Sequence, residues 1–190
     1  MTYTSTSVVN EALAAIGYDG APVTGAAPNF DSSIPGIIAA EVYSPCVEAV
    51  ARAHQWSFAR TTAALSATGN AAPFPWSYEY AFPAYCVDVW QLSPSSITDR
   101  FNPTPVTWAR GISVVSGVQS SVIWTNLASA RAVFNGNPHE SAWDSIFHQS
   151  VVNYLAHRFA IANLGKPDLM AAYLEEWGQT MQLGIGRDDQ

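Results

Sequence analysis

The stretch RAHQWSFARTTAAL, Arg52 to Leu65, joins two parts of the chain that have different sequence patterns. An alanine-rich helical run precedes it, and a threonine- and alanine-rich run leads from it into β-branched segments. Trp56 and Phe58 therefore stand where a helix ends and strands begin. We expect both rings to be buried against the helices, and His54 to bond backbone carbonyls at the helix end. The stretch predicts a structural joint and no catalytic centre.

Four helices are predicted from the spacing of apolar residues and from their cap signals. Pro45 is expected either to kink the second helix or to begin a fresh one after Ser44. Asn137-Pro138-His139-Glu140 has the form of a capping box for the third helix. Residues 184–190 are expected to form a flexible tail. The predicted helices cover about 7–16, where Gly17 is placed to end the helix, 33–54, 138–165 and 168–183.

The middle of the chain is predicted to be rich in strands. The segments ISVV and SVIWT are β-branched and separated by Gly117, which is typical of a hairpin. YEYAFPAYCVDVWQL alternates more loosely, and Pro83 favours an edge position or a bulge there. The predicted fold class is therefore α+β, a helical bundle built from N- and C-terminal helices (about 1–55 and 138–184) with a β-rich insert in the middle (about 56–136). We expect residues 1–190 to form a single domain.

The composition is typical of a subunit whose surface is partly covered by neighbouring subunits. Of 190 residues, 48% are hydrophobic and 12% are charged, whereas an average globular domain has roughly 25% charged residues. So few charges suggest that other subunits cover part of the surface. The net charge of −7 and a pI near 4.8 disfavour sequence-specific DNA binding, which needs a basic surface. A signal peptide and a membrane span are not predicted, and assembly in the cytoplasm is expected.

The histidines, cysteines and acidic residues of the chain are the candidates for a chemical site. Asp144 and His148 share a helix face, and His157 lies off that face, so we expect no metal site and no cofactor. The two cysteines, Cys46 and Cys86, are expected to be reduced thiols. No nucleophile, P-loop or dinucleotide motif is present, and no catalytic residue is assigned. A paired-carboxylate hydrolase stays open, with candidates that the sequence does not distinguish from surface charges: Glu41, Glu48, Glu79 and Asp88.

Four motifs, taken in order, carry a resemblance. His54-Gln55-Trp56-Ser57-Phe58-Ala59 is similar to a helix end that reads His-Pro-Trp-Asn-Phe-Ala, and Tyr78 to Val89 is similar to Tyr-x-Tyr-x-Leu-Pro-x-Asp-Cys-Leu-x-Val. VIWTN and WDSIFHQSVVNYLAHRFA follow. Together they resemble the tailed-bacteriophage head-tail connector, or adaptor, family, which includes tail tubular protein A-like proteins and gene transfer agent adaptors. Gln55, Ser57 and Tyr85 depart from the family pattern. The matching residues are His54, Trp56, Phe58, Ala59, Tyr78, Tyr80, Pro83, Cys86, Trp143, Asp144 and Phe147.

The resemblance implies a structural virion protein without enzymatic activity. It implies a ring, expected to be a dodecamer, that sits under the portal protein at the head-tail interface and extends the channel for double-stranded DNA. The β section is expected to recruit the next tail or nozzle protein. An acidic wall suits such a channel, because it repels phosphates and does not trap DNA. The C-terminal residues Ile185, Arg187, Asp188, Asp189 and Gln190 are expected to dock on the portal.

Two other functions remain open from the sequence. One is a tail-associated peptidoglycan hydrolase, which needs a cleft with two carboxylates, one of them with a raised pKa. The other is a monomeric head-completion or stopper module, which differs from the adaptor mainly in ring position. The order of the four motifs favours the adaptor.

Overall fold

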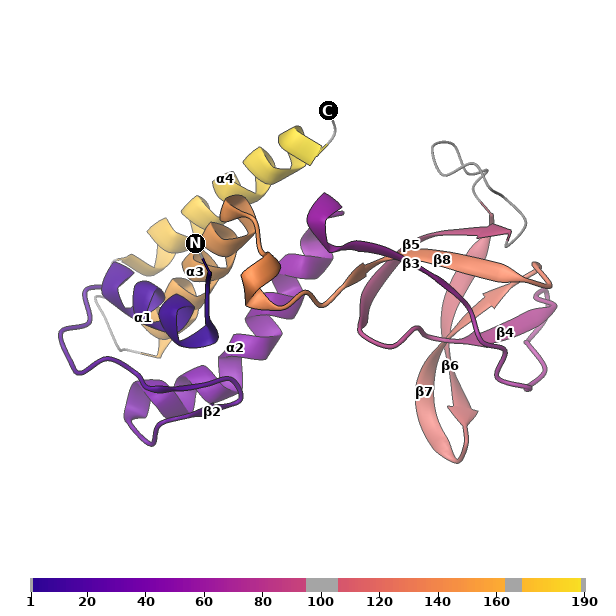
Figure 1. The fold of residues 1–190 in the computed structure, drawn as a ribbon, viewed down its shortest axis with the longest axis horizontal. Coiled ribbons are helices and arrows are strands. Elements are labelled where there is room, and N and C mark those ends of the chain that lie inside the picture. The colour runs from indigo at the N-terminus through magenta and orange to yellow at the C-terminus, as the bar shows by residue number, and fades with distance from the viewer. Residues whose placement is uncertain (1, 95–105, 163–168, 189–190) are drawn as a thin grey trace. The chain divides into compact units, whose positions relative to one another are not determined.

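The computed structural model describes residues 2–94, 106–162 and 169–188, without the side chains of 169–170 and 184–188. These residues form α-helices and antiparallel strands (Figure 1). The helices are α1 (Ser5–Ala15), α2 (Ile34–Ala53), α3 (Ser145–Ile161) and α4 (Leu169–Asp188). The strands are β1 (Gly25–Ala26), β2 (Asn29–Phe30), β3 (Arg60–Ala64), β4 (Tyr78–Ala81), β5 (Cys86–Pro94), β6 (Trp108–Val115), β7 (Val118–Thr125) and β8 (Ala130–Gly136).

The chain divides into two compact units. The helical unit consists of Met1–Phe58 and Pro138–Gln190, and the β unit consists of Ala59–Asn137. The first contains α1 to α4 with the small β1–β2 hairpin, and the second contains β3 to β8. Each unit has its own buried side chains, so each is described separately below.

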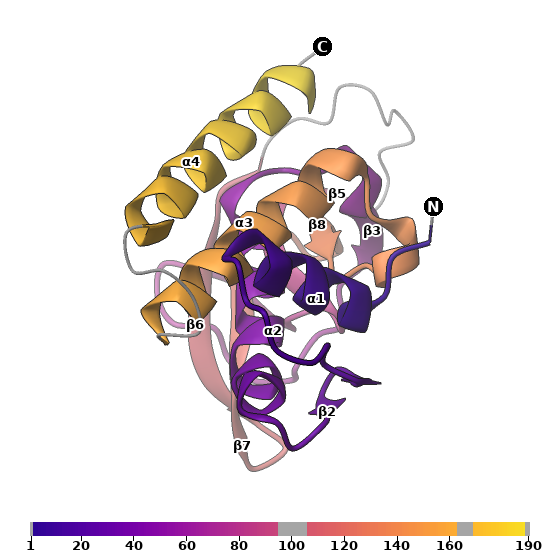
Figure 2. The ribbon, with the colours of Figure 1, turned by 90° about the vertical axis from the view of Figure 1, so that its left-hand side faces the viewer.

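In the helical unit, α3 is the central element, because it contacts α1, α2 and α4 (Figure 2). Its position explains why its sequence is apolar on several sides, with Phe147, Val151, Ala156 and Phe159 all fully buried. Local signals set the helix ends. Gly17 ends α1 in the left-handed conformation, with a φ of 71°, as its place in the sequence predicted.

Helix α2 runs without interruption through Pro45, from the N-cap Ser33 to the C-cap His54. The predicted range is confirmed, and of the two alternatives at Pro45 the fresh helix is wrong. By length and composition, α2 is the one helix among the described residues that could cross a membrane, with a mean hydropathy of 1.3. The buried core helix of a soluble protein meets the same criteria, and α2 packs against α1 and α3.

Two helix ends differ from the sequence-based expectation. His139 caps only a short 3-10 turn, Glu140–Ala142, and α3 begins at Ser145 with Asp144 as its N-cap. Trp143 interrupts the helix because its backbone is extended, with φ −65° and ψ 138°. At the other end, α4 continues to Asp188 instead of ending near Leu183. Glycine is tolerated in a helix at a cost of about 1 kcal/mol, so Gly184 and Gly186 do not stop it.

The β unit holds two three-stranded antiparallel sheets, with strand orders β3-β8-β5 and β4-β7-β6. The predicted hairpin is confirmed as β6–β7. Its two-residue turn, Ser116-Gly117, has positive φ at both positions, the geometry that matches the twist of the strands. One apolar cluster fills the unit, and it includes Tyr80, Val89, Leu92, Ile123, Ala130, Ala132 and Phe134.

The prediction of a helical bundle carrying one β-rich insert is wrong as an architecture. The described residues form an α+β chain of four helices and eight strands in three antiparallel sheets. One sheet, β1–β2, lies between α1 and α2, outside the expected insert, where a turn brings Gly25 opposite Phe30. The β-rich middle section forms two sheets around its own core, so it does not need the helices to bury its apolar side chains.

Candidate functional site

The first and last of the four motifs meet in the helical unit, in an aromatic cluster formed by Trp56, Phe58, Trp143 and Phe147. The Phe147 ring is fully buried and meets Trp56 edge to face, with centroids 5.1 Å apart. Phe58 and Trp143 contact the same Phe147 ring at 5.2 Å and 4.9 Å. Such pairs contribute about 0.5–1.5 kcal/mol each beyond their buried area. The motifs therefore build a core.

Hydrogen bonds fix the polar atoms of this cluster. The indole N–H of Trp56 donates to the Val50 carbonyl at 3.0 Å, and that of Trp143 donates to the Pro138 carbonyl at 3.1 Å. Asp144 accepts the Phe147 amide at 2.7 Å, which caps α3 and sets the position of Phe147. His54 lies edge-on to Trp56 at 5.2 Å, and its predicted bond to backbone carbonyls stays a prediction.

The second motif supplies structure to the β unit. Tyr80 is buried and donates its hydroxyl to the Leu127 carbonyl at 2.8 Å, whereas Tyr78 is exposed. Pro83 lies in the turn between β4 and β5, where its carbonyl accepts the Cys86 amide at 3.2 Å. Tyr85, which replaces a common aspartate, holds a left-handed φ of 59° in that turn. The remaining motif residue, Ala59, is buried at the start of this unit.

Glu79 is a buried carboxylate in β4, 4% exposed. Its Oε2 accepts the Trp124 indole N–H at 2.9 Å, and its Oε1 accepts from the Thr68 hydroxyl at 2.8 Å and the Asn70 amide at 3.0 Å. Burial raises the pKa of Glu79, but these hydrogen bonds outweigh it and bring the pKa below its ordinary value. Glu79 is thus an ionised group that ties the 68–70 loop to the sheet.

The other hydrolase candidates lie on other elements than Glu79. Asp88 is on β5, in the other sheet of the β unit, and Glu41 and Glu48 are on α2. Glu48 pairs with Arg52 at 2.8 Å on the surface. A glycosidase general acid needs a raised pKa, whereas the pKa of Glu79 is lowered. The lowered pKa of Glu79 therefore does not suit the general acid.

His148 and Asp144, which share a helix face in the sequence-based prediction, take separate structural roles. His148 is buried and stacks on Tyr3 with centroids 3.9 Å apart. Its Nε2 is 3.1 Å from Glu11, at ion-pair distance but out of line for a hydrogen bond. Burial lowers the pKa of His148, and the Glu11 charge opposes this. Asp144 is used as a cap, and the described residues contain no group of three or more His, Cys, Asp or Glu side chains that could hold a metal ion.

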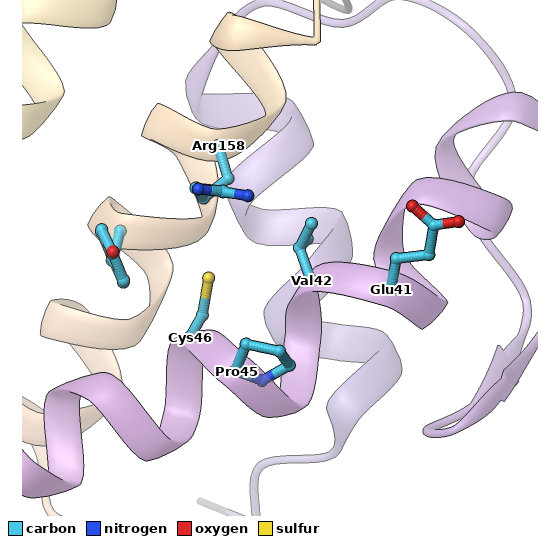
Figure 3. Close-up of a pocket in the computed structure, with 6 residues that line it drawn as sticks. Glu41, Val42, Pro45, Cys46 and Arg158 are labelled. Atoms are coloured by element: carbon cyan, nitrogen blue, oxygen red, sulfur yellow. The ribbon is translucent and has the colours of Figure 1, made fainter.

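A small pocket opens between α2 and α3 in the helical unit (Figure 3). It has a volume of about 100 Å³ and is lined by Glu41, Val42, Pro45, Cys46, Tyr154 and Arg158. Burial raises the pKa of the Cys46 thiol to about 12, against the opposing effect of the Arg158 charge, so this thiol is a packing group. Ligand pockets typically have about 300–1,000 Å³. This one has room for a side chain.

The C-terminal residues that the sequence assigns to portal docking lie at the end of α4. The backbone of Ile185, Arg187 and Asp188 is helical, but their side chains, and all of Asp189 and Gln190, lie outside the described residues. Their docking role therefore stays a prediction.

Sequence reasoning missed the Glu79 network and the α2–α3 pocket. A charge between two tyrosines in YEY was a signal for the Glu79 network, because alternation places Glu79 on the opposite face of the strand from Tyr78 and Tyr80.

No protein-family model and no curated protein matches this chain.

Proposed function

We propose that this chain is a structural virion protein, a head-tail adaptor that forms a closed ring, expected to be a dodecamer, under the portal. In this role it extends the channel for packaged DNA and joins the head to the next tail component. The proposal rests on the resemblance of the four motifs and on the surface that the structure gives each unit.

The observation that carries the proposal is that both units expose large apolar side chains. Ile34, at 69%, and Ile37, at 53%, are exposed on the helical unit. On the β6–β7 hairpin, Ile112 is 64% and Val114 is 61% exposed. Burying apolar surface is worth roughly 25 cal/mol per Å², so each exposed group favours contact with a neighbour. Two separate apolar surfaces suit a subunit that touches its copies and a further partner.

The roles of the motif residues support the same proposal. Trp56, Phe147 and Tyr80 are buried, and Asp144 is a helix cap. The resemblance to a structural family implies that the motif residues stabilise the fold, and these residues do so. The acidic balance, a net charge of −7, suits a channel wall that repels phosphates.

Native mass spectrometry tests the proposal, with the full chain measured alone and mixed with the portal protein of its particle. The proposal expects a ring of identical subunits bound to the portal at micromolar concentrations. A monomer that ignores the portal in this mixture would overturn it. A single copy bound per portal ring would instead support the stopper alternative. The peptidoglycan hydrolase alternative has no favouring observation, because the pKa of Glu79 is lowered, whereas a general acid needs a raised pKa.

A further inference from the structure

Five large apolar side chains are exposed among the described residues of the helical unit. These are Ile34, Ile37, Ile161, Leu174 and Leu183, each between 44% and 70% exposed. The first three lie on α2 and α3, the helices that form the pocket, and the last two lie on α4. We call the pocket side of α2 and α3 the groove face, and the outward side of α4 around Glu175 the α4 face.

On α2, the groove face is one helical stripe. Ile34, Ile37, Glu41 and Pro45 are spaced by three or four residues, so they share one side of the helix. Glu41 and Pro45 line the pocket, and the two isoleucines continue the stripe toward the start of α2.

On α3, the same face is formed by Tyr154, Arg158 and Ile161, again at helical spacing. The helices are antiparallel, because Trp56, just after α2, meets Phe147 near the start of α3, whereas the earlier Cys46 shares the pocket with the later Arg158. Because the end of α3 therefore lies beside the start of α2, Ile161 and Ile37 lie at the same end of the groove. The result is a largely apolar strip that carries Arg158 on α3 and Glu41 on α2.

Arg158 is the cation of this strip. It is exposed, and no carboxylate among the described residues lies within 4 Å of its guanidinium. Figure 3 shows the Cys46 thiol pointing toward Arg158, with Val42 drawn between Arg158 and Glu41. An unpaired guanidinium beside apolar side chains fits a carboxylate that arrives on an apolar surface, since Arg is well suited to interface ion pairs.

The α4 face has the matching chemistry. Tyr173, Trp177, Thr180 and Met181 face inward, which leaves Ala171, Glu175, Gly178 and Gln182 on the outer side at helical spacing. A Cβ added at Gly178 would meet nothing within 4 Å, so the outer side is open and low at this point. Glu175 accepts a long 3.5 Å hydrogen bond from Gln179, and none of the described cations pairs with it.

We propose that the groove face of one copy receives the α4 face of the next copy, with Glu175 of the second copy paired with Arg158 of the first. The exposed isoleucines of the groove face then pack against the outer side of α4, where Gly178 permits close approach. Because the two faces differ, the contact is head-to-tail, and repetition closes a ring or extends a filament. This inference rests on the proposed function and names the surfaces by which the ring would form.

Charge exchange between copies tests the contact. Arg158→Glu or Glu175→Arg alone places like charges together in every interface, and such juxtaposition costs several kcal/mol. Each variant should therefore raise the concentration for half-assembly by at least about tenfold. Mixing the two purified variants should restore assembly, because alternating copies give every interface one Arg and one Glu. Glu176→Arg, the neighbouring residue on α4 turned away from the outer side, is the matched control and should assemble as the wild type does.

The measurement is native mass spectrometry of the full chain and each variant with the portal protein, with one variant isotope-labelled in the mixture. Rings holding equal numbers of both variants support the contact. Restoration by mixing also shows that both variants are folded. Single variants that assemble like the wild type, or a mixture that fails while each variant keeps its wild-type unfolding transition, would overturn the contact and leave the adaptor proposal standing. Wild-type chains that form no oligomer would overturn both.

Discussion

Trp56 and Phe147 meet edge to face in the core of the helical unit, with ring centroids 5.1 Å apart and planes at 89°. Trp56 follows α2, and Phe147 lies in the first turns of α3, so this pair joins segments that are distant in sequence. The two residues also belong to different motifs of the resemblance. Their contact explains in physical terms why both motifs occur in one chain.

Trp56→Ala is expected to lower the free energy of unfolding of the helical unit by about 3–5 kcal/mol, the usual cost of emptying a large aromatic site. In a double-mutant cycle with Phe147→Ala, the coupling energy should be about 0.5–1.5 kcal/mol. Urea unfolding followed by far-UV circular dichroism measures both. Strict additivity of the two substitutions would show that the ring contact contributes nothing beyond burial.

Glu79→Gln is expected to destabilise the β unit at neutral pH by about 1–3 kcal/mol, because an amide cannot accept all the bonds that the carboxylate accepts. The folded pKa of Glu79 is below its ordinary value of 4.5. Its stabilising contribution is therefore fully present above that pH and is lost as the pH falls through the lower, folded pKa. Urea midpoints recorded from neutral pH to about pH 3 should fall less steeply for Glu79→Gln than for the wild type. Equal slopes would contradict this assignment.

Tyr85→Asn is expected to stabilise the β unit by about 1 kcal/mol, because asparagine adopts a left-handed backbone at lower cost than tyrosine. The φ of Tyr85 is 59° and its side chain is 85% exposed, so little packing is lost. Tyr85→Ala is the matched control, because it removes the ring without adding the short polar side chain that stabilises a left-handed backbone, and it should bring no gain. Thermal unfolding compares the three chains, and an equal gain from alanine would point to the ring instead of the backbone.

Removal of the C-terminal segment after Leu183 is expected to abolish or strongly weaken binding to the portal protein while the fold is kept. The reason is the predicted docking role of Ile185, Arg187 and Asp188. Co-sedimentation of the truncated and full chains with portal rings measures the difference. Normal binding by the truncated chain would refute the docking role.

Local signals in the sequence predicted several elements correctly. Gly17 ends α1 because glycine accepts positive φ, and Ser116-Gly117 turns the β6–β7 hairpin for the same reason. The boundaries of α2 followed from Ser33 and His54. Such signals act within a few residues, so they can be recognised from the sequence alone.

Features that depend on tertiary packing could not be predicted from the sequence. The Asn137–Glu140 segment has capping-box residues, yet Trp143 is held extended and Asp144 begins α3. β1 and β2 have two residues each, too few for any periodicity. Arg158 and Cys46 come together only because α2 and α3 pack antiparallel, a relationship that no local spacing encodes.

Electron microscopy of the full chain mixed with portal rings tests the adaptor proposal most directly. The account predicts side views with one added layer on the portal and end views with a closed ring around an open channel. Portal rings without an added layer, at micromolar concentrations of a folded chain, would contradict it.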